Sequence, residues 1–445
     1  MDERYYHSIE FHSEKCDLSL NCIRVCPTQA IRVKKNGLEF IEERCIDCGE
    51  CVKVCPNNAI IAKTNDLSEF SHFKHLVAIP SPTLYTQFGK EVNPYQILTA
   101  LKHIGFDDVY PLTWTCEAVY TAIKEFVKDY KGNFPFISSS CPVIVRLLQV
   151  LYPEMLKQLI PIDVPKEIAA KKMREEKSRS LGIRPEDIGA IYITPCPAKM
   201  ISIKQPAEKI KSYLDGAISI NDIYNQLYAQ IVRLKKDEDF KTKSEKISNT
   251  RRMLGPITKQ SLYWSVLGGD KNTKDRVGWL TASGLDNVIR IFDDLEKGKL
   301  RNVKYLQLLA CRDGCIGGTL TVENLYIARA TAIHLIEELP KLFESKQKEY
   351  IEMYKQGLFN FEGKVLPRKL DKSGNIIEAI KKKKEKDEIY KQLPNIDCGI
   401  CGAPTCLSFA EDIVNGFSEL MDCIFFAEDN FDEIKKRFIN RKKKQ

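Results

Sequence analysis

Residues 190–199 read Ala-Ile-Tyr-Ile-Thr-Pro-Cys-Pro-Ala-Lys. The apolar run at the start of this stretch predicts a buried strand, and Cys196 follows shortly after its end. Five short apolar runs of this kind alternate along the chain with helical stretches such as 94–104 and 166–180. The predicted strands are 76–80, 134–137, 190–193, 277–280 and 305–309. This alternation predicts an α/β domain of two lobes, in which helices cover small parallel sheets.

Cysteines follow three of these predicted strands. They are Cys141, Cys196, Cys311 and Cys315. Ligands of parallel α/β sheets bind at the carboxyl ends of the strands. We therefore expect four thiolates from distant parts of the sequence to converge on one site.

The composition narrows the class of protein. The chain has 445 residues, a formal net charge of +8 and 16 cysteines. Residues 1–4 are mostly charged, unlike a signal peptide, and no apolar run reaches the length of a membrane span. We therefore expect a cytoplasmic protein without membrane or nucleic-acid partners, in which reduced cysteines bind metal. The lysine runs at 381–384 and 441–444 indicate a solvated linker and tail.

Seven cysteines near the start of the chain form two related runs. The second run, Cys45-x2-Cys48-x2-Cys51-x3-Cys55-Pro, has the spacing of a bacterial ferredoxin. The first run has Ser19 where a second cysteine belongs. One predicted Fe–S site comprises Cys26, Cys45, Cys48 and Cys51, and the other comprises Cys16, Cys22 and Cys55 with Ser19 facing the fourth iron. The second site predicts a [3Fe–4S] cluster or a serine-ligated cubane, and a decayed site is the alternative.

Four further cysteines lie near the carboxyl end, at Cys398, Cys401, Cys406 and Cys423. Gly399 and Gly402 allow the backbone to fold tightly around a metal, and a helix is expected over 405–420. Four thiolates can hold zinc or a [4Fe–4S] cluster, and the neighbouring ferredoxin-like runs favour Fe–S. The predicted organisation is a two-cluster ferredoxin-like α+β module at 1–68, an α/β catalytic domain at 69–360, a partly helical linker at 361–396 and a small helical module with a basic tail at 397–445.

Three motifs in the middle of the chain carry a resemblance. They are Ser-Ser-Ser-Cys-Pro at 138–142, Thr-Pro-Cys-Pro-Ala-Lys at 194–199 and Leu-Ala-Cys-Arg-Asp-Gly-Cys-Ile-Gly-Gly at 309–318. With them the chain resembles the [FeFe]-hydrogenase family over roughly 70–340 and the ferredoxin-like module. The resemblance implies that the four central cysteines hold a [4Fe–4S] cluster. In that family one cysteine, matched here by Cys315, bridges this cluster to a diiron unit with CO and CN⁻ ligands, and the whole is called the H-cluster.

The resemblance also assigns roles to other side chains. Lys199 matches a lysine that contacts a cyanide, and the pocket residues are Pro80, Ser81, Thr194, Pro195 and Leu309. Ser140 stands where the family has a cysteine that relays protons to the diiron unit. Fast turnover needs a proton shuttle of matched pKa, so we expect slow catalysis, which suits a sensor. The subgroup that the chain resembles is the sensory [FeFe] hydrogenases, which share the carboxyl-terminal four-cysteine module.

Further positions depart from the family or lie outside its motifs. Thr121 and Ala122 occupy positions of a glutamate pair, while Glu117, Glu125 and Asp313 are acids available for another proton path. Two further residues, Thr194 and Leu309, replace methionines. Cys116 fits either a small core residue or a thiol close to the H-cluster. His7 and His12 precede the ferredoxin-like module and fit surface positions, with modulation of that module as the alternative.

We therefore predict reversible oxidation of H₂ to protons and electrons, at low rate, for sensing H₂ or redox state. The chain would hold two to four [4Fe–4S] clusters, counting the variant site at Ser19, together with the diiron unit. It would need maturation enzymes and an unidentified redox or signalling partner, and a homodimer remains open. The alternatives are an electron-transfer or cluster-assembly protein that binds only cubanes, and a redox sensor that has lost H₂ chemistry.

Overall fold

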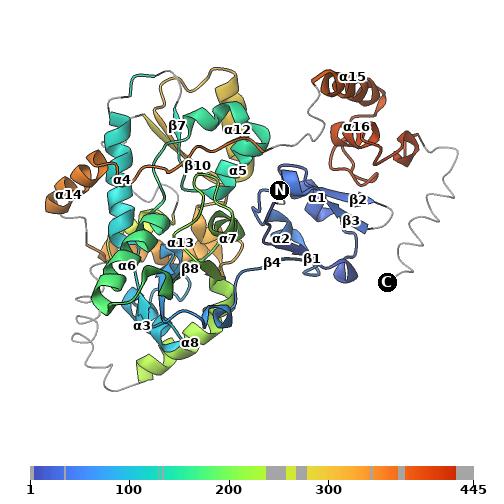
Figure 1. The fold of residues 1–445 in the computed structure, drawn as a ribbon. Coiled ribbons are helices and arrows are strands. Elements are labelled where there is room, and N and C mark those ends of the chain that lie inside the picture. The colour runs from blue at the N-terminus through green and yellow to red at the C-terminus, as the bar shows by residue number, and fades with distance from the viewer. Residues whose placement is uncertain are drawn as a thin grey trace. The chain divides into compact units, whose positions relative to one another are not determined.

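The computed structural model describes residues 5–34, 37–128, 130–132, 135–236, 257–266, 278–340, 344–368 and 376–426. The chain forms two compact units. One is Lys63–Pro367, and the other combines Met1–Ala62 with Arg368–Gln445 (Figure 1). Within the described residues, no helix has both the length and the apolar character needed to cross a membrane.

The first sheet of the larger unit has four parallel strands in the order β6-β5-β8-β9. These strands are β5 (His75–Pro80), β6 (Asp108–Val109), β8 (Ile188–Thr194) and β9 (Gly216–Ser219). Every residue of β8 is buried, because apolar side chains pack on both faces of this central strand. One face packs against α3 (Pro94–His103) and α8 (Ile220–Lys236), and the other against α6 (Pro165–Leu181) and the start of α4 (Thr113–Lys128).

The second sheet has three parallel strands in the order β10-β11-β7. They are β7 (Phe136–Ile137), β10 (Trp279–Ser283) and β11 (Tyr305–Leu309). The remaining α-helices of this unit are α5 (Pro142–Leu151), α7 (Pro197–Lys204), α11 (Lys259–Tyr263), α12 (Leu285–Glu296), α13 (Leu325–Glu338) and α14 (Glu344–Lys355). The predicted α/β architecture with small parallel sheets is therefore confirmed. Two strands begin slightly later than expected, and residues 134 and 277 lie outside the described residues.

The ferredoxin-like part of the smaller unit consists of two similar halves. Strands β1 (Ile9–Phe11) and β4 (Ile60–Ala62) form one antiparallel pair, and β2 (Ile31–Lys34) and β3 (Gly37–Phe40) form another. Two short helices, α1 (Asn21–Val25) and α2 (Glu50–Val54), contact each other between these pairs. The predicted α+β module is confirmed, and its compact unit includes residues up to Ala62.

The carboxyl-terminal part contains α15 (Ile376–Gln392) and α16 (Cys406–Val414). Thr405 caps α16, and this helix ends at Val414, earlier than the expected 420. Helix α15 differs from the expected linker, because Tyr390 and Leu393 near its end pack with Phe409 of α16. The lysine run inside α15 dominates the composition of this segment, so the sequence provides no indication of the apolar contact at its end. The four-cysteine module therefore includes α15.

Candidate functional site

Three of the four central cysteines begin helices at the carboxyl ends of strands from both sheets. Cys141 follows β7 and caps α5, while Cys196 follows β8 and caps α7. Cys315 opens the short 3₁₀ turn η8 (Cys315–Gly317), and Cys311 lies four residues earlier, just after β11. The expected placement of these four cysteines after strands is confirmed. The carboxyl ends of strands from both sheets therefore contribute cysteines to this group.

The thiols of this group lie close enough to affect one another. Burial raises the pKa of Cys196 to about 11, although Lys199 opposes the shift and thiolates at Cys141 and Cys315 reinforce it. Burial, with a further effect of Cys315, also raises the pKa of Cys141. Metal coordination is a means of stabilising several buried thiolates in one place. This donor set therefore fits a cubane with cysteine ligands.

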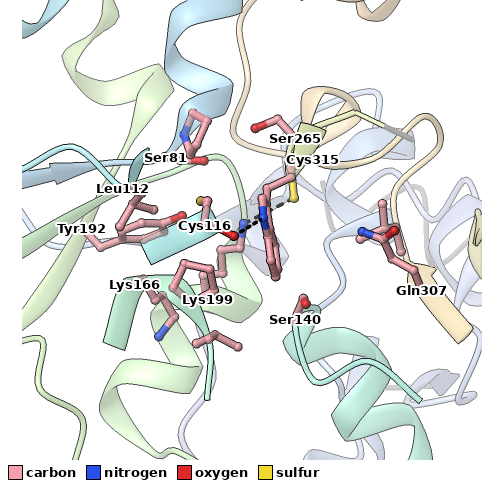
Figure 2. A pocket seen from close by; sticks show the side chains of 15 residues that line it. Ser81, Leu112, Cys116, Ser140, Lys166, Tyr192, Lys199, Ser265, Gln307 and Cys315 are labelled. Atoms are coloured by element: carbon pink, nitrogen blue, oxygen red, sulfur yellow. Dashed lines mark hydrogen bonds between the residues drawn. The ribbon is translucent and has the colours of Figure 1, made fainter. Parts of the chain in front are cut away.

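A cavity lies beside this cysteine group (Figure 2). Its lining includes five residues that the resemblance singled out, namely Ser81, Ser140, Lys199, Leu309 and Cys315. Pro80, Thr194 and Pro195 have other positions. Pro80 ends β5, and the Thr194 hydroxyl accepts a hydrogen bond from the Cys196 amide at 3.1 Å and donates to the Cys196 carbonyl at 3.0 Å. The Pro195 carbonyl accepts from the Leu320 amide at 3.0 Å. These backbone contacts orient the Cys196 turn.

Lys199 is the principal cation of the cavity. It lies in the first turn of α7, and its Nζ donates a hydrogen bond to Cys315 Sγ at 3.4 Å. The same Nζ is 5.9 Å from the centre of the Tyr192 ring. Burial opposes the positive charge, but Cys315 and Tyr192 favour it more strongly, so the pKa of Lys199 lies well above its usual value. A fixed buried ammonium is suited to holding an anionic ligand next to Cys315.

The effects of the ferredoxin-like cysteines on one another's pKa mostly follow the two predicted groups, although Cys22 also contributes to the raised pKa of Cys51. Burial raises the pKa of Cys22 to about 11, with contributions from Cys16 and Cys55. Burial also raises the pKa of Cys48, with contributions from Cys51 and Cys26. The pKa of Cys45 is raised by burial first, and Asp47, Cys48 and Cys26 add to the shift. These proximities fit two Fe–S sites.

Ser19 is exposed in the loop between Cys16 and Cys22, and its amide donates to Asp17 at 3.1 Å. Its role as a ligand stays a prediction. The surface position expected for His7 is wrong, because the His7 side chain is only 8% exposed and its Nδ1 lies 2.9 Å from an Asp47 carboxylate oxygen. His12 is partly exposed beside Glu14.

The four carboxyl-terminal cysteines line one cavity, together with Asp397, Gly399 and Ala403 of the loop and Phe409 of α16. Burial raises the pKa of Cys401 to about 11, and Cys398, Cys423 and Cys406 add to the shift. Gly399 and Gly402 adopt left-handed φ values of 75° and 88°, which let this loop turn around the cavity. The residues fit a metal centre with four thiolate ligands.

Comparison of the sequence with known protein families identifies the family of the larger unit. A family described as "Iron only hydrogenase large subunit, C-terminal domain" matches residues 74–319, more than half of the chain. The chain belongs to the iron-only hydrogenase family. A 4Fe-4S dicluster domain matches residues 8–59, and an Fe–S cluster domain matches residues 393–425.

The individual relatives of this hydrogenase-family chain are distant. Iron hydrogenase 1 of Clostridium pasteurianum is 22% identical over 290 residues, which are 55% of this chain and 50% of that protein. The chain thus spans about half the length of that curated relative. The corrinoid/iron-sulfur protein large subunit of Moorella thermoacetica is 49% identical over 41 residues, 9% of each chain. A solved [FeFe]-hydrogenase of Chlamydomonas reinhardtii has a TM-score of 0.48 at 15% identity, covering 68% of this chain and 98% of its own.

Several cavity residues of this hydrogenase-family chain were not assigned from sequence. Cys116 packs in the core, as expected, and it also lines the cavity, while its proximity to an H-cluster stays a prediction. Trp264 lines it too, and its Nε1 donates to the Cys116 carbonyl at 3.0 Å. Tyr192 lies two residues before Thr194 on the same side of β8, and strand alternation could have identified it. Gln307 is a polar residue inside an otherwise apolar strand, which was an available signal. Lys166 also lines the cavity, although its position at the start of α6 gave no such signal.

Ser140 lies between two cavities. The second cavity shares Ser140, Val164 and Lys166 with the first and is also lined by Glu208. The Ser140 and Ser138 hydroxyl oxygens are 2.8 Å apart, so the two hydroxyls form a hydrogen-bonded pair.

The other candidate acids have different surroundings. Glu117 is buried next to Cys116, accepts a hydrogen bond from the Thr258 hydroxyl and has its pKa raised by burial. Glu125 lies 3.8 Å from Lys128, and Asp313 forms a 2.8 Å ion pair with Arg329. Glu117 is therefore the candidate acid nearest in sequence to a cavity-lining side chain.

Proposed function

We propose that this chain catalyses the reversible oxidation of H₂ to protons and electrons at an H-cluster, at a low rate, and that it serves to sense H₂ or redox state. The observation that carries the proposal is the pairing of Lys199 with Cys315 inside the cavity at the cysteine group. The buried ammonium singles out one of the four ligand sulfurs, and it faces the cavity in which an anionic ligand beside Cys315 would lie.

The roles of the chain's own residues follow from their positions. Cys141, Cys196, Cys311 and Cys315 would hold the cubane, and Cys315 would also carry the diiron unit. That unit, when bound, supplies the metal site at which H₂ is split. Lys199 would donate a hydrogen bond to an anionic ligand and fix its orientation.

The walls of the cavity would exclude bulk water. Leu112, Val164 and Trp264 are apolar residues of its lining, and Ser81 and Tyr192 contribute polar groups. A dry, fixed environment strengthens the electrostatic effect of Lys199 on any anion held there.

Proton transfer supports the expectation of slow turnover. Ser140 occupies the position between the two cavities, but a serine hydroxyl can only pass on a proton that a neighbour supplies. Its partner Ser138 is another hydroxyl and cannot act as an acid near neutral pH. Replacing Ser140 with cysteine should therefore raise the H₂ turnover rate, measured with an artificial electron acceptor. An unchanged rate would mean that transfer through this position does not limit turnover.

The decisive measurement is the infrared spectrum of protein treated with the maturation enzymes of the family. We expect CO and CN⁻ stretching bands, and we expect the CN⁻ bands to shift in a Lys199→Met variant. Absence of these bands from fully matured protein would favour the alternative in which only cubanes bind. Bands without any H₂ oxidation would indicate a redox sensor that has lost H₂ chemistry. The cytoplasm is the proposed location, since the clusters require reduced cysteines.

A further inference from the structure

The loop that begins the carboxyl-terminal cysteine site lies directly on the ferredoxin-like module. The Val33 amide of β2 donates a hydrogen bond to the Gly402 carbonyl at 2.8 Å. A Cβ atom at Gly402 would lie 1.6 Å from the Val33 carbonyl oxygen, so only glycine permits this approach. A Cβ atom at Gly399 would lie 3.4 Å from Cδ1 of Ile23 in α1. The loop carries Cys398 and Cys401 and is in backbone contact with its neighbour.

Helix α1, which lies beside this loop, carries cysteines of both predicted ferredoxin-type sites. Ile23 is fully buried in α1, directly after Cys22, and Cys26 follows the end of the same helix. Cys22 belongs to one predicted Fe–S site and Cys26 to the other. A loop with two predicted ligands of the carboxyl-terminal site thus lies beside the Ile23 side chain, between Cys22 and Cys26, which are predicted ligands of different ferredoxin-type sites.

Buried charges fix this contact in one geometry. Arg32 is 1% exposed, and its Nε donates to an Asp412 carboxylate oxygen of α16 at 2.8 Å. Lys34 Nζ contacts the same oxygen at 3.0 Å and the Ser418 hydroxyl at 2.6 Å. Asp412 is itself only 3% exposed. Burying such charges carries a large desolvation penalty, and removing one partner leaves the other unpaired, so the pairing specifies one orientation.

We propose that the carboxyl-terminal four-cysteine module is a fixed electron-transfer partner of the ferredoxin-like module. One electron would pass across the contact of loop 398–402 with α1, so that one Fe–S cluster is oxidised by one electron as another is reduced by one. Electron tunnelling falls steeply with distance, and here the ligand-bearing loop makes a direct backbone hydrogen bond to the ferredoxin-like module, from the Val33 amide to the Gly402 carbonyl. The proposal goes beyond H₂ chemistry and rests only on Fe–S clusters in these two modules.

The test is electron paramagnetic resonance of the full-length protein, assembled with cubanes only and reduced with dithionite. We expect magnetic interaction between the carboxyl-terminal cluster and a ferredoxin-type cluster, seen as splitting or broadening of the reduced signals. The variant Asp412→Arg places a cation against Arg32 and should abolish the interaction while the iron content stays unchanged. The combined change Arg32→Asp with Asp412→Arg should restore it, and Glu385→Ala, which removes an exposed acid of α15, should leave it unchanged.

A second comparison keeps the proposal testable if Asp412→Arg does not fold. The double variant Cys398→Ser, Cys401→Ser removes the carboxyl-terminal cluster, and the remaining signals should become narrower than in the unmodified protein. Identical signals in the two proteins would overturn the proposal, as would an interaction that survives in folded Asp412→Arg. None of these readouts depends on H₂ turnover, so the result is independent of whether the diiron unit is present.

Discussion

Replacement of Gly318 by alanine should remove the central cubane and little else. Gly318 lies where the Cys315 turn meets the Cys196 turn, and its amide donates to the Cys315 carbonyl at 3.0 Å. A Cβ atom at this position would lie 2.3 Å from the Pro195 carbonyl oxygen and 2.9 Å from the Cys315 carbonyl oxygen. The φ of Gly318 is −66°, which any residue adopts, so the substitution introduces a clash without backbone strain.

The size of the displacement follows from these distances. Real Cβ atoms essentially never approach another heavy atom within 3.0 Å, so the Pro195 carbonyl must move away by about 0.7 Å. Ligand distances in a metal site are held to about 0.2 Å. The shift also weakens the hydrogen bond from the Leu320 amide to the Pro195 carbonyl, which contributes about 1 kcal/mol. Cys196 would therefore move out of reach of a cluster that the other three cysteines hold.

The assay is the iron content and the reduced-state paramagnetic resonance spectrum of protein reconstituted anaerobically without maturation enzymes. We expect the Gly318→Ala protein to hold about four fewer iron atoms per chain, which is one cubane. The matched control is Gly182→Ala, whose left-handed φ of 66° makes it strained while no atom lies within 4 Å of the added Cβ. That control should lose about 1 kcal/mol of stability and no iron. Full iron content and an unchanged spectrum for Gly318→Ala would refute this reasoning.

Three further variants test the surroundings of the site. Lys209→Met should lower the free energy of unfolding by about 3–5 kcal/mol in chemical denaturation, because it leaves the buried carboxylate of Asp163 without its lysine, whereas Glu167 keeps its ion pair with Lys166. A loss below about 1 kcal/mol would contradict this. Burial raises the pKa of Glu117, so folding favours its protonated form. The stability of the unmodified protein relative to Glu117→Gln should therefore fall as pH rises through the folded-state pKa of Glu117. Melting temperatures of the two proteins at several pH values would show this fall, and a rise in relative stability would refute it. Cys116→Ala should cost about 1 kcal/mol of stability and leave the iron content unchanged, whereas loss of iron would identify Cys116 as a ligand.

The parts of the fold that were predictable from sequence depend on local patterns. The strand at 305–309 has the bounds of β11, because a short run that is apolar apart from Gln307 leaves one plausible element. The cysteine groups were predictable because ligand spacing is local within each loop. The placement of Cys141, Cys196 and Cys315 also followed, since parallel strands present their carboxyl ends together.

The remaining features depend on contacts between distant segments. Trp264 lies on a segment without a clear period, and only tertiary packing brings its indole to the Cys116 carbonyl. The burial of His7 depends on Asp47, forty residues away in the sequence. Helix α15 was obscured because its lysines dominate the composition, while its apolar contacts are confined to its last turn. Buried polar pairs such as Arg32 with Asp412 leave no periodic signal in either segment.

The origin of the central cysteines in two separate sheets has a consequence for assembly of the protein. Cys141 and Cys311 follow strands of one sheet, whereas Cys196 follows a strand of the other. A cluster bound to all of them would act as a covalent cross-link, closing chain loops of roughly 50 to 120 residues. Closing such loops early removes much of the conformational entropy of the unfolded chain, and the benefit grows only with the logarithm of loop length. The bound cubane would then link the β10-β11-β7 sheet to the β6-β5-β8-β9 sheet. Its insertion would stabilise the packing of the two sheets against each other.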